Sequence, residues 1–273
     1  MPDLLNHRLR SGPQGEATLL MVHPLGADLS FWDECVARWG DRRATLAVDL
    51  RSAGRSPGSD SPPTLDTHVA DLLALLDVHG IDRVVAVGCA MGGAVAVALA
   101  AALPGRVVGL VMANPELRLD DGARIRLAER ADLLEAGGPE AVLPAAVDNV
   151  FAGLDDPVRK ARYLAAFRQL DGRRAAACIR GFLSADVTTA TAAIQCPTLL
   201  VAAVHDMLGG HDAVGAMCRF LPAAHWATLA GASHFGPYQA PAQFVDIVEA
   251  FLNALSDDGP TQEGKFGRSP PIE

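Results

Sequence analysis

Short apolar segments with the length of β-strands alternate with longer segments of helical periodicity along most of this chain. The strand-like segments are residues 19–22, 44–48, 83–87, 107–112, 198–202 and 225–229. The helical segments are residues 31–39, 64–80, 91–103, 210–220 and 241–255. Repeated passage from a buried strand through a helix to another buried strand is typical of parallel sheets with crossover helices. The alternation therefore predicts an α/β fold with a mostly parallel sheet flanked by helices.

The alternation stops in the middle of the chain, where residues 115–192 show helical periodicity and no convincing strand. A helical block inside an alternating α/β chain indicates an inserted cap. We therefore expect an α/β core made of residues 1–114 and 193–255, with a helical cap at 115–192. Residues 256–273 are polar and contain glycine and proline, so we expect a disordered tail.

The strand-like segment 83–87 runs directly into Gly88-Cys89-Ala90-Met91-Gly92-Gly93, and a helical segment follows. This is the context of a nucleophile elbow, G-x-Nu-x-G, in which the nucleophile sits on a sharp turn between strand and helix. Side chains two residues before and after the nucleophile would collide, so glycine is needed at both places. Gly88 and Gly92 hold them, and Ala90 therefore occupies the nucleophile position.

The spacing of residues around this turn argues against several other interpretations of it. Cys89 is a weaker candidate nucleophile, because its neighbours at the two glycine places would be the bulky Val87 and Met91. The spacings of a dinucleotide fingerprint and of a P-loop are both absent. A packing turn without any catalytic role remains the alternative.

Two residues further along the chain complete the set that such an elbow requires. Asp206 follows the strand-like segment 198–202, and His234 lies in a loop after the segment 225–229. Open α/β sheets place their sites at the carboxyl ends of strands. The chain order of nucleophile position, acid and base is that of α/β-hydrolases. We therefore predict that His234 accepts a proton and that Asp206 orients its ring; the alternatives are a loop histidine and a helix N-cap.

Backbone N–H groups are expected to contact the substrate at two positions. Leu25 lies in His23-Pro24-Leu25-Gly26 after the first strong strand, and Met91 follows the nucleophile position. The N–H groups of these two residues are predicted to form an oxyanion hole. A metal cluster of His205, His211 and Asp212 is conceivable but meets no defined ligand spacing, so solvent-facing side chains are expected there.

Composition excludes several classes of function. The net charge is −9 and no basic run is interleaved with aromatic residues, which argues against a nucleic-acid partner. Five widely spaced cysteines without a CxxC pair suggest free thiols in a reducing cytoplasm. The N-terminus lacks a signal-peptide pattern. Residues 84–105 are uncharged and long enough to span a membrane, but their glycines favour a strand, a turn and a buried helix. The expected partner is a small-molecule substrate, and a homo-oligomer is left open.

The sequence resembles the α/β-hydrolase fold family, and within it most closely the 3-oxoadipate enol-lactonases. The matching segments are residues 24–33, 48–51, 65–93 and 172–178, and the resemblance extends over about residues 19–255. It implies a hydrolase that acts on a small carboxylic ester or lactone without metal or cofactor. By this resemblance Ala90 holds the nucleophile's place, Asp206 the acid's and His234 the base's.

The sequence departs from the family pattern in three places. Alanine stands where the family has serine, the loop that often reads R-G-H-G-x-S is Arg51-Ser52-Ala53-Gly54-Arg55-Ser56, and the Arg-Trp-Phe element of the cap is replaced near residues 149–151. The last change weakens the prediction of an enol-lactone. Four arginines of the cap could supply a cation that binds a carboxylate, namely Arg168, Arg173, Arg174 and Arg180. Solvent exposure is nevertheless the expected outcome for each of them.

Three hypotheses follow from Ala90, because a methyl group cannot attack a carbonyl. The first is that the chain is a serine hydrolase whose nucleophile has been replaced, by design or in nature. Alternatively, it is an enzyme that needs no nucleophile and uses His234 and Asp206 as a base for hydrolysis, a lyase or decarboxylase step or cofactor-free chemistry. Thirdly, it is a non-catalytic relative that binds a ligand; intact His234 and Asp206 argue against this.

Overall fold

The computed structural model describes residues 3–208, 217, 220–221, 223–256 and 267–268, and these contain one sheet of eight strands. The strand order is β1-β3-β2-β4-β5-β6-β7-β8. Their bounds are His7–Arg10 (β1), Thr18–Val22 (β2), Thr45–Val48 (β3), Val84–Cys89 (β4), Val107–Ala113 (β5), Thr198–Ala203 (β6), His225–Leu229 (β7) and Gly267–Arg268 (β8). All pairings from β3 to β7 are parallel. The prediction of a mostly parallel sheet is confirmed.

The two edge strands are antiparallel to their neighbours and were not predicted. In β1, His7–Arg10, three of four residues are polar and half are exposed, so no apolar run marks the strand. Strand β8 has two residues and pairs with His225 and Trp226 of β7. The predicted disordered tail otherwise lies outside the described residues, as does most of the predicted helix 210–220.

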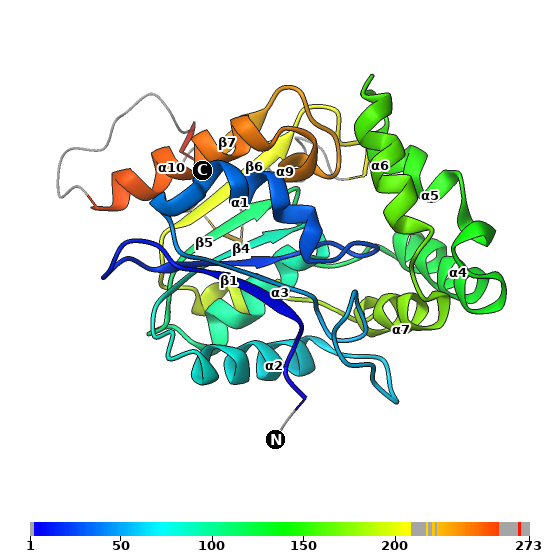
Figure 1. The fold of residues 1–273 in the computed structure, drawn as a ribbon, viewed down its shortest axis with the longest axis horizontal. Coiled ribbons are helices and arrows are strands. Elements are labelled where there is room, and N and C mark those ends of the chain that lie inside the picture. The colour runs from blue at the N-terminus through cyan, green and yellow to red at the C-terminus, as the bar shows by residue number, and fades with distance from the viewer. Residues whose placement is uncertain (1–2, 209–216, 218–219, 222, 257–266, 269–273) are drawn as a thin grey trace.

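Helices cover both faces of the sheet (Figure 1). Helix α1 (Asp33–Trp39) and helix α10 (Pro241–Ser256) lie on one face, and helices α2 (Leu65–Val78) and α3 (Met91–Ala102) lie on the other. The side chains of β2 alternate between two cores: Leu19 and Met21 pack on the side of α1 and α10, whereas Leu20 and Val22 pack on the side of α2 and α3. Burial of the strands on both faces explains why they are continuous apolar runs in the sequence.

Residues 84–105 form β4, a tight turn and α3. Helix α3 is buried along most of its length because it packs on the sheet and also contacts α2. Its lack of charge therefore reflects burial inside the protein. Within the described part of the chain, none of the helices combines the length and apolar character needed to cross a membrane.

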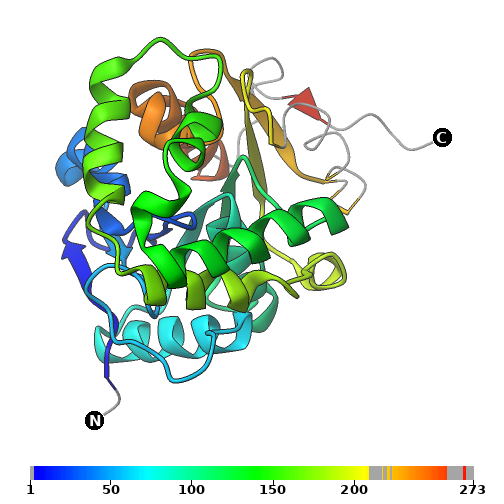
Figure 2. The same cartoon turned by 90° about the vertical axis from the view of Figure 1, so that its right-hand side faces the viewer.

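The chain between β5 and β6 is helical. Its helices are α4 (Asp121–Gly137), α5 (Ala145–Asp148), α6 (Pro157–Phe167) and α7 (Gly172–Phe182), with short 3-10 turns at Pro139–Val142, Asn149–Phe151 and Ala190–Ala193. Figure 2 shows α4 to α7 together in front of the sheet. Near its two ends, Arg118 and Asp186 form an antiparallel bridge. We refer to residues 115–192 as the helical segment; its status as a separate cap domain stays a prediction.

Short helices complete the core. A 3-10 turn (η1, Leu29–Trp32) precedes α1, another (η2, Gly40–Arg42) follows it, and α9 (Gly236–Gln239) precedes α10. The predicted helix 31–39 is thus a 3-10 turn that continues into α1. Helix α2 is capped by Thr64, whose hydroxyl accepts the N–H of Thr67 in a capping box.

One arginine ties the helical segment to the core. Arg159 of α6 pairs with Glu34 of α1 at 2.8 Å and donates to the carbonyl of Tyr238 at 2.6 Å. The pair is only partly exposed, so its hydrogen bonds are screened less than those of a surface pair. We expect Arg159→Met to lower the free energy of unfolding by about 1–3 kcal/mol.

The matched control is Arg168→Met, because Arg168 pairs with Glu140 at 2.8 Å where both side chains are about half exposed or more. This variant should change the free energy of unfolding by about 0.5 kcal/mol or less. Urea unfolding of both variants measures the difference. Equal losses would contradict the anchoring role of Arg159.

Candidate active site

The turn between β4 and α3 has the backbone that a sharp elbow requires. Ala90 has φ 49° and ψ −120°, a conformation that non-glycine residues rarely adopt. A Cβ atom on Gly88 would lie 2.2 Å from the carbonyl oxygen of Gly92, and one on Gly92 would lie 2.4 Å from that of Val22. Both places therefore require glycine, in agreement with the steric argument from the sequence.

His234 and Asp206 are brought together by the loops after β7 and β6. The ring Nδ1 of His234 lies 3.1 Å and 3.2 Å from the two carboxylate oxygens of Asp206. The Asp206 side chain is 1% exposed and that of His234 is 12% exposed. A buried carboxylate at Nδ1 fixes the orientation of the imidazole ring, so Nε2 is the ring nitrogen left for proton transfer.

Asn114 is a member of this group that sequence analysis missed. It follows β5 directly, has φ 47°, and donates from Nδ2 to Asp206 Oδ2 at 2.7 Å. The N–H of Leu208 donates to the other carboxylate oxygen at 2.9 Å. A polar residue at the carboxyl end of a buried strand is a sequence signal that could have identified Asn114.

The hydrogen bonds on Asp206 hold it in the charged form. Burial by itself raises the pKa of this carboxyl, but the hydrogen bonds with His234, Asn114 and the Leu208 N–H outweigh burial and lower the pKa to about 2. Asp206 is therefore a carboxylate at every pH at which the protein is expected to work.

Four of the predicted site residues line one cavity of about 510 Å³: Leu25, Ala90, Met91 and His234. Met91 is the first residue of α3, so its N–H has no acceptor within the helix. Asp206 lies behind His234 and does not line the cavity. The helical segment supplies much of the remaining lining, including side chains of α4 and the residues around Val150.

Glu116 also lines this cavity, just beyond the end of β5. Burial raises the pKa of its carboxyl, and the nearby ring of His234 opposes that shift. Nothing in the sequence singled out Glu116. It places a second proton-carrying group in the cavity that holds His234.

A buried cation faces the same cavity. Arg130 of α4 lines it, its guanidinium lies 5.6 Å from the ring centre of Phe167, and burial lowers its pKa. Its Nε has no hydrogen-bond partner and its guanidinium no carboxylate partner among the described residues. A largely buried arginine that has no carboxylate partner in the described part of the chain favours an anionic ligand group.

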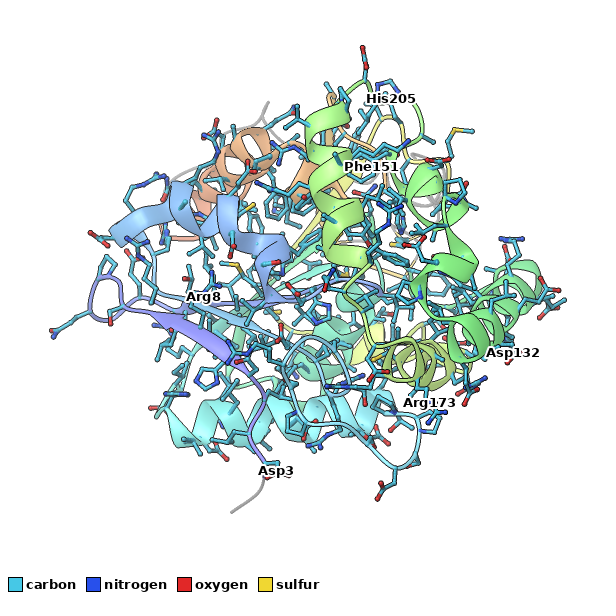
Figure 3. All side chains as sticks on the ribbon, turned by 45° about the vertical axis from the view of Figure 1, so that its right-hand side comes forward. Asp3, Arg8, Asp132, Phe151, Arg173 and His205 are labelled. Carbon is cyan, nitrogen blue, oxygen red and sulfur yellow. The ribbon has the colours of Figure 1, made fainter. Side chains whose placement is uncertain are left out.

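The four arginines named from the sequence are not part of this lining. Arg168 pairs with Glu140, and Arg180 pairs with Asp132 and Glu135. Figure 3 shows Arg173 and Asp132 at the outer surface of the helical segment. Arg174 lines a different cavity. The cavity arginine, Arg130, lies instead on α4, whose sequence has no distinct apolar face to mark it as inward-facing.

The structure gives no support to the weaker candidates, which are Cys89 as a nucleophile and the metal cluster around His205. Cys89 is fully buried, and burial raises the pKa of its thiol well above the usual value, so the thiolate is disfavoured. His211 and Asp212 lie outside the described residues. Within the described ranges, no group of three or more His, Cys, Asp or Glu residues is arranged to hold a metal ion.

The lowered pKa of Asp206 makes a prediction about acid stability. A carboxyl whose folded pKa is depressed stabilises the fold above its unfolded pKa, near 3.9, and this contribution is lost as the pH falls toward 2. We expect the unfolding free energies of the protein and of Asp206→Asn to differ by about 2 kcal/mol less at pH 2 than at pH 6. Denaturant unfolding at several pH values measures this. A difference that stays constant with pH would contradict the assigned hydrogen bonds.

Comparison with known proteins agrees with the resemblance seen in the sequence. Residues 19–247 match the model of a family described as the alpha/beta hydrolase family. The chain is 26% identical over 250 residues to 3-oxoadipate enol-lactonase 2 of Acinetobacter baylyi, covering 90% of this chain and 92% of the relative. It is 42% identical over 120 residues to lipase LipV of Mycobacterium tuberculosis, covering 44% of this chain and 45% of LipV.

A solved structure shows the same similarity in three dimensions. The enol-lactonase from Burkholderia xenovorans LB400 superposes with a TM-score of 0.81 at 26% identity. The match covers 91% of this chain and 96% of that protein. The predicted resemblance to the enol-lactonases is thus confirmed, both in sequence and in fold.

Proposed function

This chain belongs to the alpha/beta hydrolase family, and we propose that its site is built to hydrolyse a small carboxylic ester or lactone, with Ala90 at the nucleophile's position. The observation that carries the proposal is the arrangement at one cavity: the strained turn at Ala90 and the ring of His234, which is oriented by Asp206. The family membership supports a hydrolase, and its lactonase and lipase relatives support an ester-type bond.

Each residue has a definite role in the proposed reaction. With serine at position 90, the hydroxyl oxygen attacks the carbonyl carbon while His234 Nε2 accepts the hydroxyl proton. The negative charge on the carbonyl oxygen is met by the N–H groups of Leu25 and Met91. His234 then donates the proton to the leaving alkoxide, and a water molecule, activated by the same ring, releases the acyl group. Asp206 stays charged and stabilises the imidazolium.

With alanine at position 90, the covalent step has no attacking atom. The cavity, the two N–H groups and the His234–Asp206 pair are retained, so the protein should bind ester substrates and turn them over very slowly. Some residual catalysis by the oxyanion hole is expected in such a protein.

Arg130 supports a substrate that carries a carboxylate. Arg130 lines the cavity together with Val142 and Tyr163, and it lacks a carboxylate partner among the described residues. A carboxylate on the substrate would supply that charge. We further propose that the helical segment acts as a cap that contributes this arginine and excludes water from the site.

Glu116 supports a second candidate function, an enzyme that uses Ala90 as it stands. A carboxyl with a raised pKa and a histidine paired to a carboxylate line one cavity, which provides a proton donor and a proton acceptor. Such a site could activate water directly, or remove a proton from the substrate without a covalent intermediate.

One experiment separates the two candidates. Hydrolysis of small esters and lactones, with and without a carboxylate and including the 3-oxoadipate enol-lactone, is measured for the protein, for Ala90→Ser and for His234→Ala. Turnover by the serine variant alone, with a burst of alcohol release, supports the hydrolase proposal. Turnover by the unmodified protein that is lost in His234→Ala supports the second candidate and overturns the first.

A further inference from the structure

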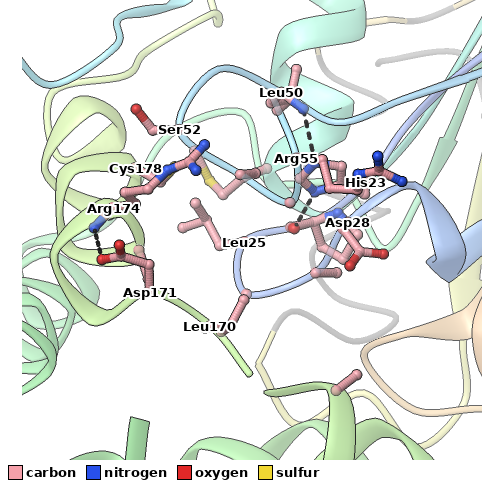
Figure 4. Close-up of a pocket in the computed structure, with 18 of the residues that line it drawn as sticks. His23, Leu25, Asp28, Leu50, Ser52, Arg55, Leu170, Asp171, Arg174 and Cys178 are labelled. Carbon is pink, nitrogen blue, oxygen red and sulfur yellow. Dashed lines mark hydrogen bonds between the residues drawn. The ribbon is translucent and has the colours of Figure 1, made fainter. Parts of the chain in front are cut away.

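The structure contains a second cavity, of about 240 Å³, which Figure 4 shows in close-up. The two cavities share Pro24, Leu25 and Met91 in their walls. The rest of its lining comes from the loops after β2 and β3, from α2, and from the region of α6 and α7. It contains neither Ala90 nor His234, so it is a separate place for a ligand. We call it the second cavity.

Three polar side chains of the second cavity carry buried atoms whose hydrogen-bonding capacity is unused. These atoms are Ser52 Oγ, both ring nitrogens of His68, and Arg174 Nε, none of which has a partner among the described residues. Ser52 is 3% exposed and His68 is fully buried. Most buried polar atoms in proteins have a partner, so several unsatisfied ones around one cavity indicate a ligand that supplies them.

The protein fixes these groups in place. Ser52 has φ 65°, an unfavourable conformation for serine, and its N–H donates to the carbonyl of Pro57 at 2.9 Å. The ring of His68 stacks on Phe182 with centroids 5.4 Å apart. The guanidinium of Arg174 donates to the carbonyl of Ser56. Figure 4 shows Ser52, Arg174 and Cys178 on one side of the cavity.

The donors and acceptors define the complementary ligand. Burial lowers the pKa of His68 to about 4, an effect that Arg51 and His23 add to and Asp71 opposes, so the ring is neutral at pH 7. A neutral ring has one N–H donor and one acceptor nitrogen. Together with the Ser52 hydroxyl and the Arg174 Nε–H, the cavity offers three donors suited to a carboxylate. The ring acceptor requires a donor on the ligand, such as a hydroxyl group.

We propose that the second cavity binds a compact hydroxycarboxylate, whose carboxylate meets Arg174 and Ser52 and whose hydroxyl group meets His68. The volume is below the roughly 300–1,000 Å³ of pockets for drug-sized ligands, which suits a molecule of few heavy atoms. Two acidic residues also line the cavity. Asp171 is engaged by the N–H groups at the start of α7, Asp28 by the N–H of Ser30, and the nearby Arg55 adds positive charge.

The proposal is tested with lactate as the probe, compared with propionate, which lacks the hydroxyl, and lactamide, which lacks the charge. Calorimetry gives the affinities, and NMR of histidine-labelled protein follows the ring signals of His68, assigned with His68→Gln. We expect lactate to bind about tenfold or more tightly than either analogue, since hydrogen bonds to charged groups are the stronger ones. The His68 signals should shift on saturation.

Two variants remove the ligand contacts separately. Ser52→Gly deletes the hydroxyl and relieves the positive φ, so it should fold at least as well as the parent and bind lactate about tenfold or more weakly. Arg174→Gln should weaken binding to a similar extent. Arg173→Gln is the matched control, because Arg173 is the exposed neighbour on the same helix and should leave the affinity unchanged.

The outcomes that overturn the proposal are distinct. Equal binding of the three probes, unmoved His68 signals at saturation, or unchanged affinity in Ser52→Gly each exclude a hydroxycarboxylate site here. If lactate binding is lost in Arg130→Met and retained in Ser52→Gly, the ligand occupies the first cavity and the proposal for the second is wrong. That result would leave the hydrolase proposal intact.

Discussion

Ala90→Ser is expected to raise the turnover of a suitable ester or lactone by roughly 10³- to 10⁶-fold. The upper value corresponds to the loss seen when a serine hydrolase is deprived of its nucleophile. The substitution adds one oxygen to a Cβ that already sits at the turn, where φ is 49°, and no backbone change is needed. The measurement is steady-state hydrolysis together with a rapid-mixing assay for an acyl-enzyme burst.

The control for this gain is the double variant Ala90→Ser/His234→Ala. Without the ring that accepts the proton, the serine hydroxyl is a weak nucleophile, and activity should return to near that of the unmodified protein. If Ala90→Ser changes turnover by less than tenfold across the ester and lactone panel, the assignment of position 90 as the nucleophile's place is wrong.

Gly92→Ala is expected to destabilise the fold by about 3 kcal/mol or more. The added methyl group would lie 2.4 Å from the carbonyl oxygen of Val22 and 2.7 Å from that of His23. Both oxygens belong to backbone at the end of β2, which cannot rotate away as a side chain would. For a protein of this size the loss corresponds to a fall in Tm on the order of 10 °C.

Gly93→Ala is the matched control, since it adds the same methyl group one residue later in the same helix. The nearest atoms to its Cβ would be Pro115 Cβ at 3.5 Å, Pro115 Cα at 3.7 Å and Met112 Cβ at 3.8 Å, all ordinary contacts. Helix propensity favours alanine by up to about 1 kcal/mol, so Tm should be unchanged or higher. Thermal unfolding by circular dichroism compares the two. Similar losses in both variants would show that the helix rather than the elbow is sensitive.

The buried parts of the fold were predictable from the sequence because burial leaves a pattern. Strands β2 to β6 are enclosed on both faces, so each is an apolar run bounded by turn residues. The edge strand β1 is held by backbone hydrogen bonds to β3 and carries polar side chains, which gives no such pattern. The elbow was found because its steric requirement fixes two glycines at a set spacing.

The site was only partly predictable because long-range contacts decide it. His234 and Asp206 follow strands in a known order, and the structure brings them within hydrogen-bonding distance. Asn114 and Arg130 were missed because their roles depend on tertiary contacts. Asn114 meets Asp206 in the loop after β6, and Arg130 lies on the face of α4 that lines the cavity. Asn114 reaches Asp206 across 92 positions of sequence, a contact that no local pattern encodes.

The antiparallel bridge between Arg118 and Asp186 means that the helical segment leaves the core and returns to it at neighbouring points. Its length can therefore change by insertion or deletion while the strands on either side keep their register. If the helical segment binds the substrate through Arg130 as proposed, selection can change that contact independently of the loops that carry His234 and Asp206. In that case ligand binding and catalysis depend on different parts of the chain, and each can evolve without the other.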